Sequence, residues 1–121
     1  MGAKIIHRYY IFMLMIVSLS AAAKVLPETS SFTQQQIFTH WVENRCIGKI
    51  TADKALVSDA NASAAAWLEV SSLPVEVFEK ADAAIDKGLK EPLTGSTHYS
   101  YNVLKCTLIA QSRDIQHLYS Q

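Results

Sequence analysis

Apolar residues recur at steps of three and four between positions 37 and 46, which is the spacing of one helix face. They are Ile37, Phe38, Trp41, Val42 and Cys46. Ser30, Ser31 and Thr33 are candidate N-caps, and three consecutive glutamines follow them as partners in the first turn. Gly48 suits a C-cap. The pattern predicts a helix over residues 32–47.

The next segment, residues 59–70, is dense in alanine and serine. Thr51 or Asp53 can cap a helix that contains it, and a break near Ser58 stays open. Small side chains let a neighbouring helix approach closely. We therefore expect this helix at the centre of a bundle, with Trp67 and Leu68 anchoring its C-terminal end.

A third helix is predicted over residues 74–90. Pro74 suits the first helical position, where its missing N–H costs nothing. Two glutamates near the start and two lysines near the end complement the helix dipole. The expected buried stripe is Phe78, Ala81, Ile85 and Leu89.

Residues 91–96 contain Pro92 and Gly95 and predict a loop. Ser96 or Thr97 can cap a fourth helix over residues 98–111. Its expected core residues are Val103, Cys106 and Ala110, with Tyr101, Leu104 and Leu108 on an adjoining face. Ser112 caps a short last helix, from which Ile115, Leu118 and Tyr119 pack back. No segment combines alternating apolar residues with a hairpin turn, so the predicted fold is all-α, a compact bundle of four to five helices.

Residues 1–23 have the features of a cleaved secretory signal peptide. Lys4 and Arg8 precede the apolar run 11–17, and Ala21 to Ala23 offer a cleavage pattern that competes with one ending at Ala22. A membrane anchor is the alternative, but the run is well below the roughly 20 residues that span a bilayer. We therefore expect a single domain over residues 24–121, with no membrane anchor after cleavage.

The charge balance of that domain disfavours nucleic acid as a partner. Without Lys4 and Arg8, nine of the eleven basic residues remain against eleven acidic ones. The nine basic residues do not form a cluster. Half of the residues of the whole chain are apolar and only 18% are charged, which excludes an intrinsically disordered chain.

The chain has two cysteines, Cys46 and Cys106, both on predicted apolar helix faces. Export to an oxidising compartment favours a structural disulfide between them. Closing this 60-residue loop contributes about 4 kcal/mol in the chain-entropy model. The alternative is a catalytic thiolate, which needs a nearby histidine. His40 lies six residues before Cys46, on a different side of the predicted helix.

The chain carries none of the common catalytic, metal or phosphate-binding motifs, and we expect no enzyme activity, metal site or cofactor. His40, His98 and His117 are scattered. A protein-binding surface remains, because tyrosines in a loop favour interfaces. The alternative is an ordinary loop whose tyrosines pack on the bundle. The candidate contacts are a loop set, Glu91, Leu93, Thr94, Gly95, Ser96, Thr97, His98, Tyr99 and Tyr101, and an acidic helix set, Glu76, Glu79 and Asp82.

The order and spacing of several short strings resemble a known family. These strings are Asn44-Arg-Cys46-Ile, the alanine-rich run ending Trp67-Leu-Glu69, Leu73-Pro74, Gly95-Ser96 and Asn102-x-x-Lys-Cys106. In this order, they resemble the group-four immunity proteins of type VI secretion amidase effectors. The resemblance implies a periplasmic, all-helical and often dimeric inhibitor, whose cysteine pair Cys46 and Cys106 matches. Its implied target is a papain-like (NlpC/P60-type) amidase that cleaves peptidoglycan peptides between D-glutamate and diaminopimelate.

The resemblance further implies that the inhibitor covers the active site of the amidase and so protects the producing cell and its siblings. Two other functions stay open from the residues alone. One is a small disulfide-bonded periplasmic acid-stress chaperone, and the other is a small enzyme or metal protein that uses the histidines.

Overall fold

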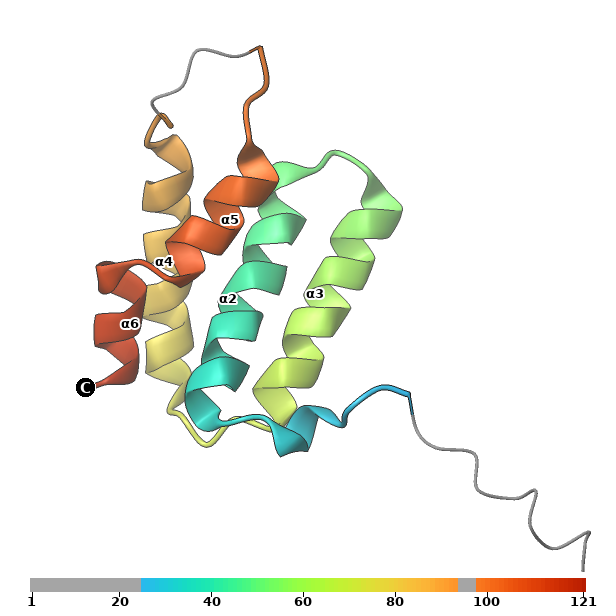
Figure 1. Ribbon diagram of the computed structural model, residues 1–121, viewed down its shortest axis with the longest axis vertical. Helices are drawn as coiled ribbons and strands as arrows, with labels where there is room; N and C mark the ends of the chain where they lie inside the picture. Colours follow the sequence, from blue (N-terminus) through green and yellow to red (C-terminus); the bar gives the residue numbers. More distant parts are fainter. Residues whose placement is uncertain (1–24, 94–97) are drawn as a thin grey trace, which may run out of the picture.

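The computed structural model describes residues 25–93 and 98–121, which form an all-α bundle (Figure 1). These residues contain one short 3-10 helix and five α-helices, in the order η2 (Thr29–Ser31), α2 (Gln34–Ile50), α3 (Lys54–Glu69), α4 (Val75–Lys90), α5 (Asn102–Ala110) and α6 (Arg113–Tyr119). The predicted fold class is confirmed. The predicted signal peptide lies outside the described residues.

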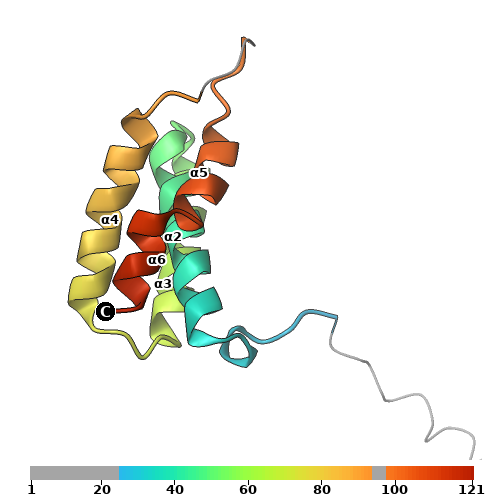
Figure 2. The same cartoon turned by 60° about the vertical axis from the view of Figure 1, so that its left-hand side comes forward.

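Helix α2 occupies the centre of the bundle, with α3 on one side and α4 on the other, while α5 and α6 cover a third side (Figures 1 and 2). The core residues on α2 are Phe38, Val42 and Cys46, all fully buried. Ile85 of α4 and Ile115 of α6 pack against them. The prediction that the alanine-rich helix is central is therefore wrong, because α3 packs almost entirely on α2 at the edge of the bundle.

Helix α2 begins as its sequence predicts and ends later. The Thr33 hydroxyl accepts a hydrogen bond from the Gln36 backbone N–H at 3.2 Å, and the Thr33 N–H donates to the Gln36 side chain at 2.9 Å. The helix continues through Gly48 to Ile50, so a C-cap at Gly48 is wrong. A Cβ atom at Gly48 would lie 3.1 Å from Oδ1 of Asn61. Glycine at this position therefore lets α3 approach α2 closely.

Helix α3 is capped by Asp53, whose carboxylate accepts hydrogen bonds from the N–H groups of Ala55 and Leu56, and it runs through Ser58 without a break. Trp67 packs against the core as predicted. Leu68 is 39% exposed, so its predicted role as an anchor is wrong. It lies one turn after the buried Ala64, where the space between α3 and α4 is open to solvent.

Helix α4 follows Pro74, which stands at the N-cap position, and its predicted stripe is confirmed. Phe78, Ala81 and Ile85 are buried, and Leu89 packs against the core. Helix α5 crosses the C-terminal half of α4 at Gly88, where an added Cβ would lie 2.8 Å from Cγ1 of Ile109. The absence of a side chain at Gly88 is what allows this close packing.

Helix α5 begins at Asn102, four residues later than predicted, and Tyr101 is its N-cap. Tyr101 adopts a left-handed backbone conformation with φ of 52°, which turns the chain into the helix. Val103 is 65% exposed, so its predicted place in the core is wrong, and Ile109 is buried with Cys106 and Ala110 instead. Val103 lies one turn before Cys106 on nearly the same face, but it is in the first turn of α5, beyond the part of the helix that packs on the core. In α6 the Ser112 cap and buried Ile115 are confirmed.

A disulfide joins Cys46 of α2 to Cys106 of α5, with the Cα atoms 5.5 Å apart. Both residues are buried in the core. The predicted pairing is confirmed, and the bond ties α5 to the central helix α2. Among the described helices, none has the length and apolar character needed to cross a bilayer.

Candidate partner-binding surfaces

The predicted contact loop lies between α4 and α5, at one end of the bundle. Residues 98–101 extend beyond the start of α5, away from the body of the molecule (Figures 1 and 2). Tyr99 is 77% exposed, and its ring lies 6.1 Å from that of Tyr101, centroid to centroid. Neither tyrosine is buried in the bundle, and Glu91, Leu93 and His98 are exposed as well. Thr94, Gly95, Ser96 and Thr97 lie outside the described residues.

The predicted acidic set lies on α4, and the structure does not bring it together with the loop. Glu76 and Glu79 are exposed near the start of α4, whereas Glu91 follows its last residue. A helix rises 1.5 Å per residue, so Glu76 and Glu91 are separated by about 20 Å along the helix. The two sets form two separate areas rather than one continuous patch.

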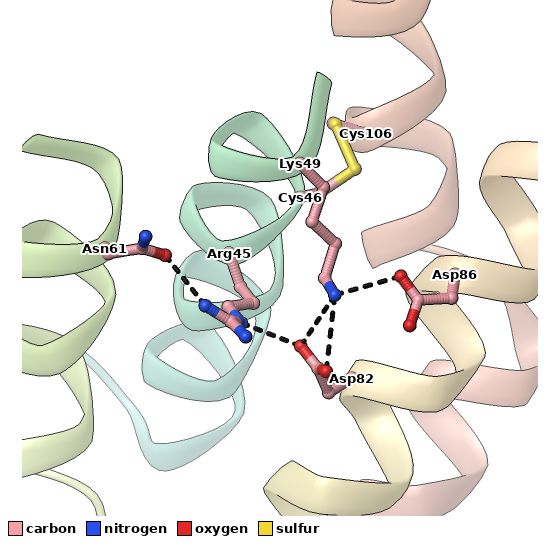
Figure 3. A network of polar contacts seen from close by, with 7 residues as sticks. All are labelled: Arg45, Cys46, Lys49, Asn61, Asp82, Asp86 and Cys106. Atoms are coloured by element: carbon pink, nitrogen blue, oxygen red, sulfur yellow. Dashed lines mark hydrogen bonds and ion pairs between the residues drawn. A yellow bond between two sulfur atoms is a disulfide. The ribbon is translucent and has the colours of Figure 1, made fainter. Parts of the chain in front are cut away.

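Asp82, the third acidic candidate, belongs to a polar network between α2, α3 and α4 (Figure 3). Its carboxylate accepts a hydrogen bond from Nε of Arg45 at 2.7 Å and pairs with Nζ of Lys49 at 3.3 Å. Arg45 also donates from Nη1 to Oδ1 of Asn61 on α3 at 2.8 Å. Lys49 pairs with Asp86, one turn further along α4, at 2.9 Å.

The two cations hold Asp82 in its charged form. Partial burial raises the pKa of the Asp82 carboxyl, but the hydrogen bonds from Arg45 and Lys49, together with their positive charges, lower it further than burial raises it. The resulting pKa lies below its ordinary value of 3.8. The charge of Asp82 is therefore balanced inside the protein, whereas Glu79 makes no hydrogen bond or ion pair within the described residues.

An exposed apolar face on α5 is a surface that the sequence pattern missed. Val103, Leu104 and Leu108 are each about half exposed or more. The prediction placed the start of this helix too early and so assigned Val103 to the core. The amino-acid composition of α5 could have indicated this face. Its only charged residue is Lys105, and it has more apolar residues than one buried stripe can hold.

The three histidines of the described residues lie on different elements, α2, the loop before α5, and α6. His40 lies 4.8 Å from the Trp67 ring, centroid to centroid, and its Nδ1 lies 3.1 Å from Oε2 of Glu43. His98 is in the contact loop, and His117 lies near the C-terminus. Within residues 25–93 and 98–121 there is no group of histidine, cysteine and carboxylate side chains suited to a metal ion.

A small helical domain with a buried disulfide and a projecting tyrosine loop has the features of a helical binding protein. The family model of the type VI secretion system (T6SS) amidase immunity protein matches residues 36–119. The chain belongs to this family, and it is an immunity protein rather than an acid-stress chaperone. The family is one of inhibitors rather than enzymes. A comparison with curated proteins gives no match.

Solved structures agree with this assignment. One is the crystal structure of the effector Tae4 from Salmonella typhimurium in complex with the immunity Tai4 from Enterobacter cloacae. It contains a chain that is 57% identical to this protein, with a TM-score of 0.75. The match covers 78% of this chain and 98% of that chain. The Tae4–Tai4 complex from Enterobacter cloacae contains a chain that is 56% identical to this protein, with a TM-score of 0.77. This match covers 81% of this chain and 100% of that chain. A chain of the Salmonella typhimurium Tae4/Tai4 system is 24% identical to this protein, with a TM-score of 0.72, and the match covers 79% of this chain and 95% of that chain. At this identity, the match supports the fold alone.

Proposed function

We propose that this protein binds an amidase effector of the Tae4 kind and blocks its active-site cleft. The observation that carries the proposal is the 57% identity to a chain of a Tae4–Tai4 complex over 78% of this protein. An effector of this class is a papain-like amidase acting on peptidoglycan peptides. Its inhibition protects the producing cell and its siblings, and the immunity protein performs no chemistry of its own.

The loop from Glu91 to Tyr101 is the proposed plug. Two adjacent exposed tyrosines supply apolar area and hydroxyl groups with little side-chain entropy to lose. The scaffold behind the loop is rigid, because the disulfide holds α5 and the Gly88–Ile109 contact holds α4 against it. A loop presented on a rigid scaffold loses less freedom on binding, which favours tight capture.

The acidic residues of α4 are proposed to contribute charged contacts at the rim of the complex. Glu76 and Glu79 are exposed and suit a basic partner surface. Asp82 belongs to the same proposed set, but Arg45 and Lys49 already balance its charge, so its contribution to binding is the smallest of the three.

The proposed site of action is the periplasm, reached by cleavage of a signal peptide after Ala22 or Ala23. We also propose a homodimer. The exposed face of Val103, Leu104 and Leu108 supports it, because an uncharged apolar face can pair with its own copy without charge repulsion.

A binding titration of the purified mature chain with its amidase tests the plug. Tyr99→Ala combined with Tyr101→Ala is expected to weaken capture more than tenfold and to leave the circular dichroism spectrum unchanged, since the Tyr99 ring is largely solvent-exposed. Tyr119→Phe is a matched aromatic control, because Tyr119 packs on the core away from this loop. An unchanged affinity of the double variant would remove the loop from the binding surface.

A further inference from the structure

The disulfide attaches α5 to the bundle at one particular point. Cys106 is the first buried residue of this helix, and its bond to Cys46 of α2 lies inside the core (Figure 3). The other two buried residues of α5, Ile109 and Ala110, lie at its C-terminal end. The bond is therefore the anchor of the first half of α5, whereas packing anchors the second half.

The chain before Cys106 has little packing of its own against the bundle. Among the described residues from 98 to 105, none is buried, and none belongs to the hydrophobic core or to the side chains packed against it. Nζ of Lys105 donates a hydrogen bond to the carbonyl oxygen of Leu89 at 3.4 Å, which is long for such a bond. The order of this segment therefore depends on the covalent bond more than on packing.

The same segment carries the two tyrosines of the proposed plug. Tyr99 is 77% exposed, and Tyr101 has the left-handed backbone conformation at the start of α5. A residue other than glycine keeps this conformation only where the surrounding structure fixes the backbone. The positions of both rings relative to the bundle are therefore set by how firmly the first turn of α5 is held.

Reduction of the disulfide removes this anchor and leaves the rest of the core in place. The two thiols remain small and apolar, but non-bonded sulfur atoms repel each other at bonding distance, so α2 and α5 must separate at this point. The second half of α5 is held against α4, because Ile109 packs on Gly88 too closely for an added Cβ. The displacement therefore falls on the first half of α5 and on the tyrosines before it.

We propose that the Cys46–Cys106 bond is a redox switch for capture of the amidase effector. The oxidised chain holds Tyr99 and Tyr101 in position for binding, and the dithiol chain does not. The inference rests on the proposed function and concerns the regulation of the same surface.

The switch is set by the compartment in which the chain folds. Forming the bond takes one proton from each thiol and two electrons in total, and a disulfide oxidant accepts both electrons and both protons and becomes two thiols. A reducing compartment keeps the chain in the dithiol form, and an oxidising compartment allows the bond to form. The chain therefore becomes competent to capture an effector only after it leaves a reducing compartment. Both cysteines are buried in the folded chain, which shields the bond from later reduction.

The first measurement examines the chain without an effector. One NMR sample is oxidised, and the other is unfolded, reduced with dithiothreitol and refolded with the reductant present. In the dithiol form, the backbone chemical shifts of residues 102–105 are expected to lose more than half of their helical displacement, while those of α3 stay unchanged. Unchanged shifts at residues 102–105, or unfolding of the whole chain, overturn the proposal.

The second measurement is a calorimetric titration with the purified effector and no reductant, so that only the immunity protein is altered. Cys46→Ala combined with Cys106→Ala is expected to weaken binding at least tenfold. Val42→Ala is the control, because it removes buried atoms of α2 one turn before Cys46 and leaves the bond intact, and it should bind within twofold of the unmodified chain.

The outcomes of this titration separate the two proposals. Equal losses in the cysteine and Val42 variants mean that lowered stability weakens binding, which overturns the switch. A cysteine variant that binds as tightly as the unmodified chain overturns it as well. No binding by the oxidised unmodified chain overturns the proposed function itself.

A combined variant connects the bond to the tyrosines. In a chain that already carries Tyr99→Ala and Tyr101→Ala, removal of both cysteines is expected to weaken binding by less than a further threefold, because the groups that the bond holds in position are absent. A further tenfold loss would show that the bond acts through another surface, and the role assigned to the tyrosines would be wrong.

Discussion

The two sides of α2 are covered by different kinds of interaction. On the α5 and α6 side, a disulfide and the buried side chains of Ile109 and Ile115 close the core. On the side that faces α4, Arg45 and Lys49 of α2 form ion pairs with carboxylates of α4. A covalent bond adds to apolar packing on the first side, while the partly exposed ion pairs on the second side add little to stability. The two sides therefore differ in what supplements apolar packing: a covalent bond on one and partly exposed ion pairs on the other.

Removal of the disulfide is expected to have the largest effect on stability. Cys46→Ala combined with Cys106→Ala loses about 4 kcal/mol of unfolding free energy by the loop-closure model. Urea unfolding followed by circular dichroism measures the loss. The unmodified chain treated with a reductant is the control and should approach the same midpoint. A double variant as stable as the unmodified chain would show that packing alone closes this side.

Overpacking between α4 and α5 is expected to have the next largest effect. Gly88→Ala places a Cβ 2.8 Å from Ile109, a β-branched side chain with little freedom to move. The expected loss of stability is about 1 to 2 kcal/mol, which outweighs the gain in helix propensity from alanine. Thermal unfolding measures it. Ile109→Ala removes Cγ1 and Cδ1, the two atoms nearest to the added Cβ, so the double variant should lose less stability than the two single variants together. Additive losses would point to a cause other than this contact.

The ion pairs between α2 and α4 are expected to have the smallest effect on stability, with a defined pH dependence. The pKa of Asp82 is lower in the folded protein than its ordinary 3.8, so its stabilisation is present above that pH and is lost as the pH falls through the lowered pKa. Asp82→Asn is expected to lose up to about 1 kcal/mol at neutral pH.

The difference between the Asp82→Asn variant and the unmodified chain should disappear in acid. Urea unfolding at a series of pH values from 7 down to about 2 measures it, with Asp59→Asn as an exposed control. A constant difference across this range would mean that the lost stability comes from packing and not from the charge of Asp82.

Local signals in the sequence predicted the helices and most of their caps. Thr33, Asp53 and Ser112 act on backbone groups within three residues, so their roles follow from the neighbouring sequence. Gly48 failed as a predicted cap because its role depends on Asn61, which belongs to the next helix. Val103 failed because one left-handed residue, Tyr101, decides where α5 begins.

The candidate surfaces were less predictable than the fold. The loop could be recognised from Pro92 and the tyrosines, and the resemblance supplied the class of partner. The polar network between α2, α3 and α4 could not be found from local patterns, since it depends on Arg45 meeting Asp82, which lies 37 positions away in the sequence. The same pairing explains why Asp82, read from the sequence as a free acidic residue, is internally balanced.

Helix α2 is covered in part by residues of α6, at the other end of the described chain. Gln116 of α6 accepts a hydrogen bond from Gln35 at 2.8 Å, and the ring of Tyr119 stacks on that of Phe38 with centroids 6.2 Å apart. While the ribosome is still making the polypeptide, α2 therefore lacks the helices that cover it. We therefore expect folding of this domain to be completed only after residues 113–119 have been synthesised.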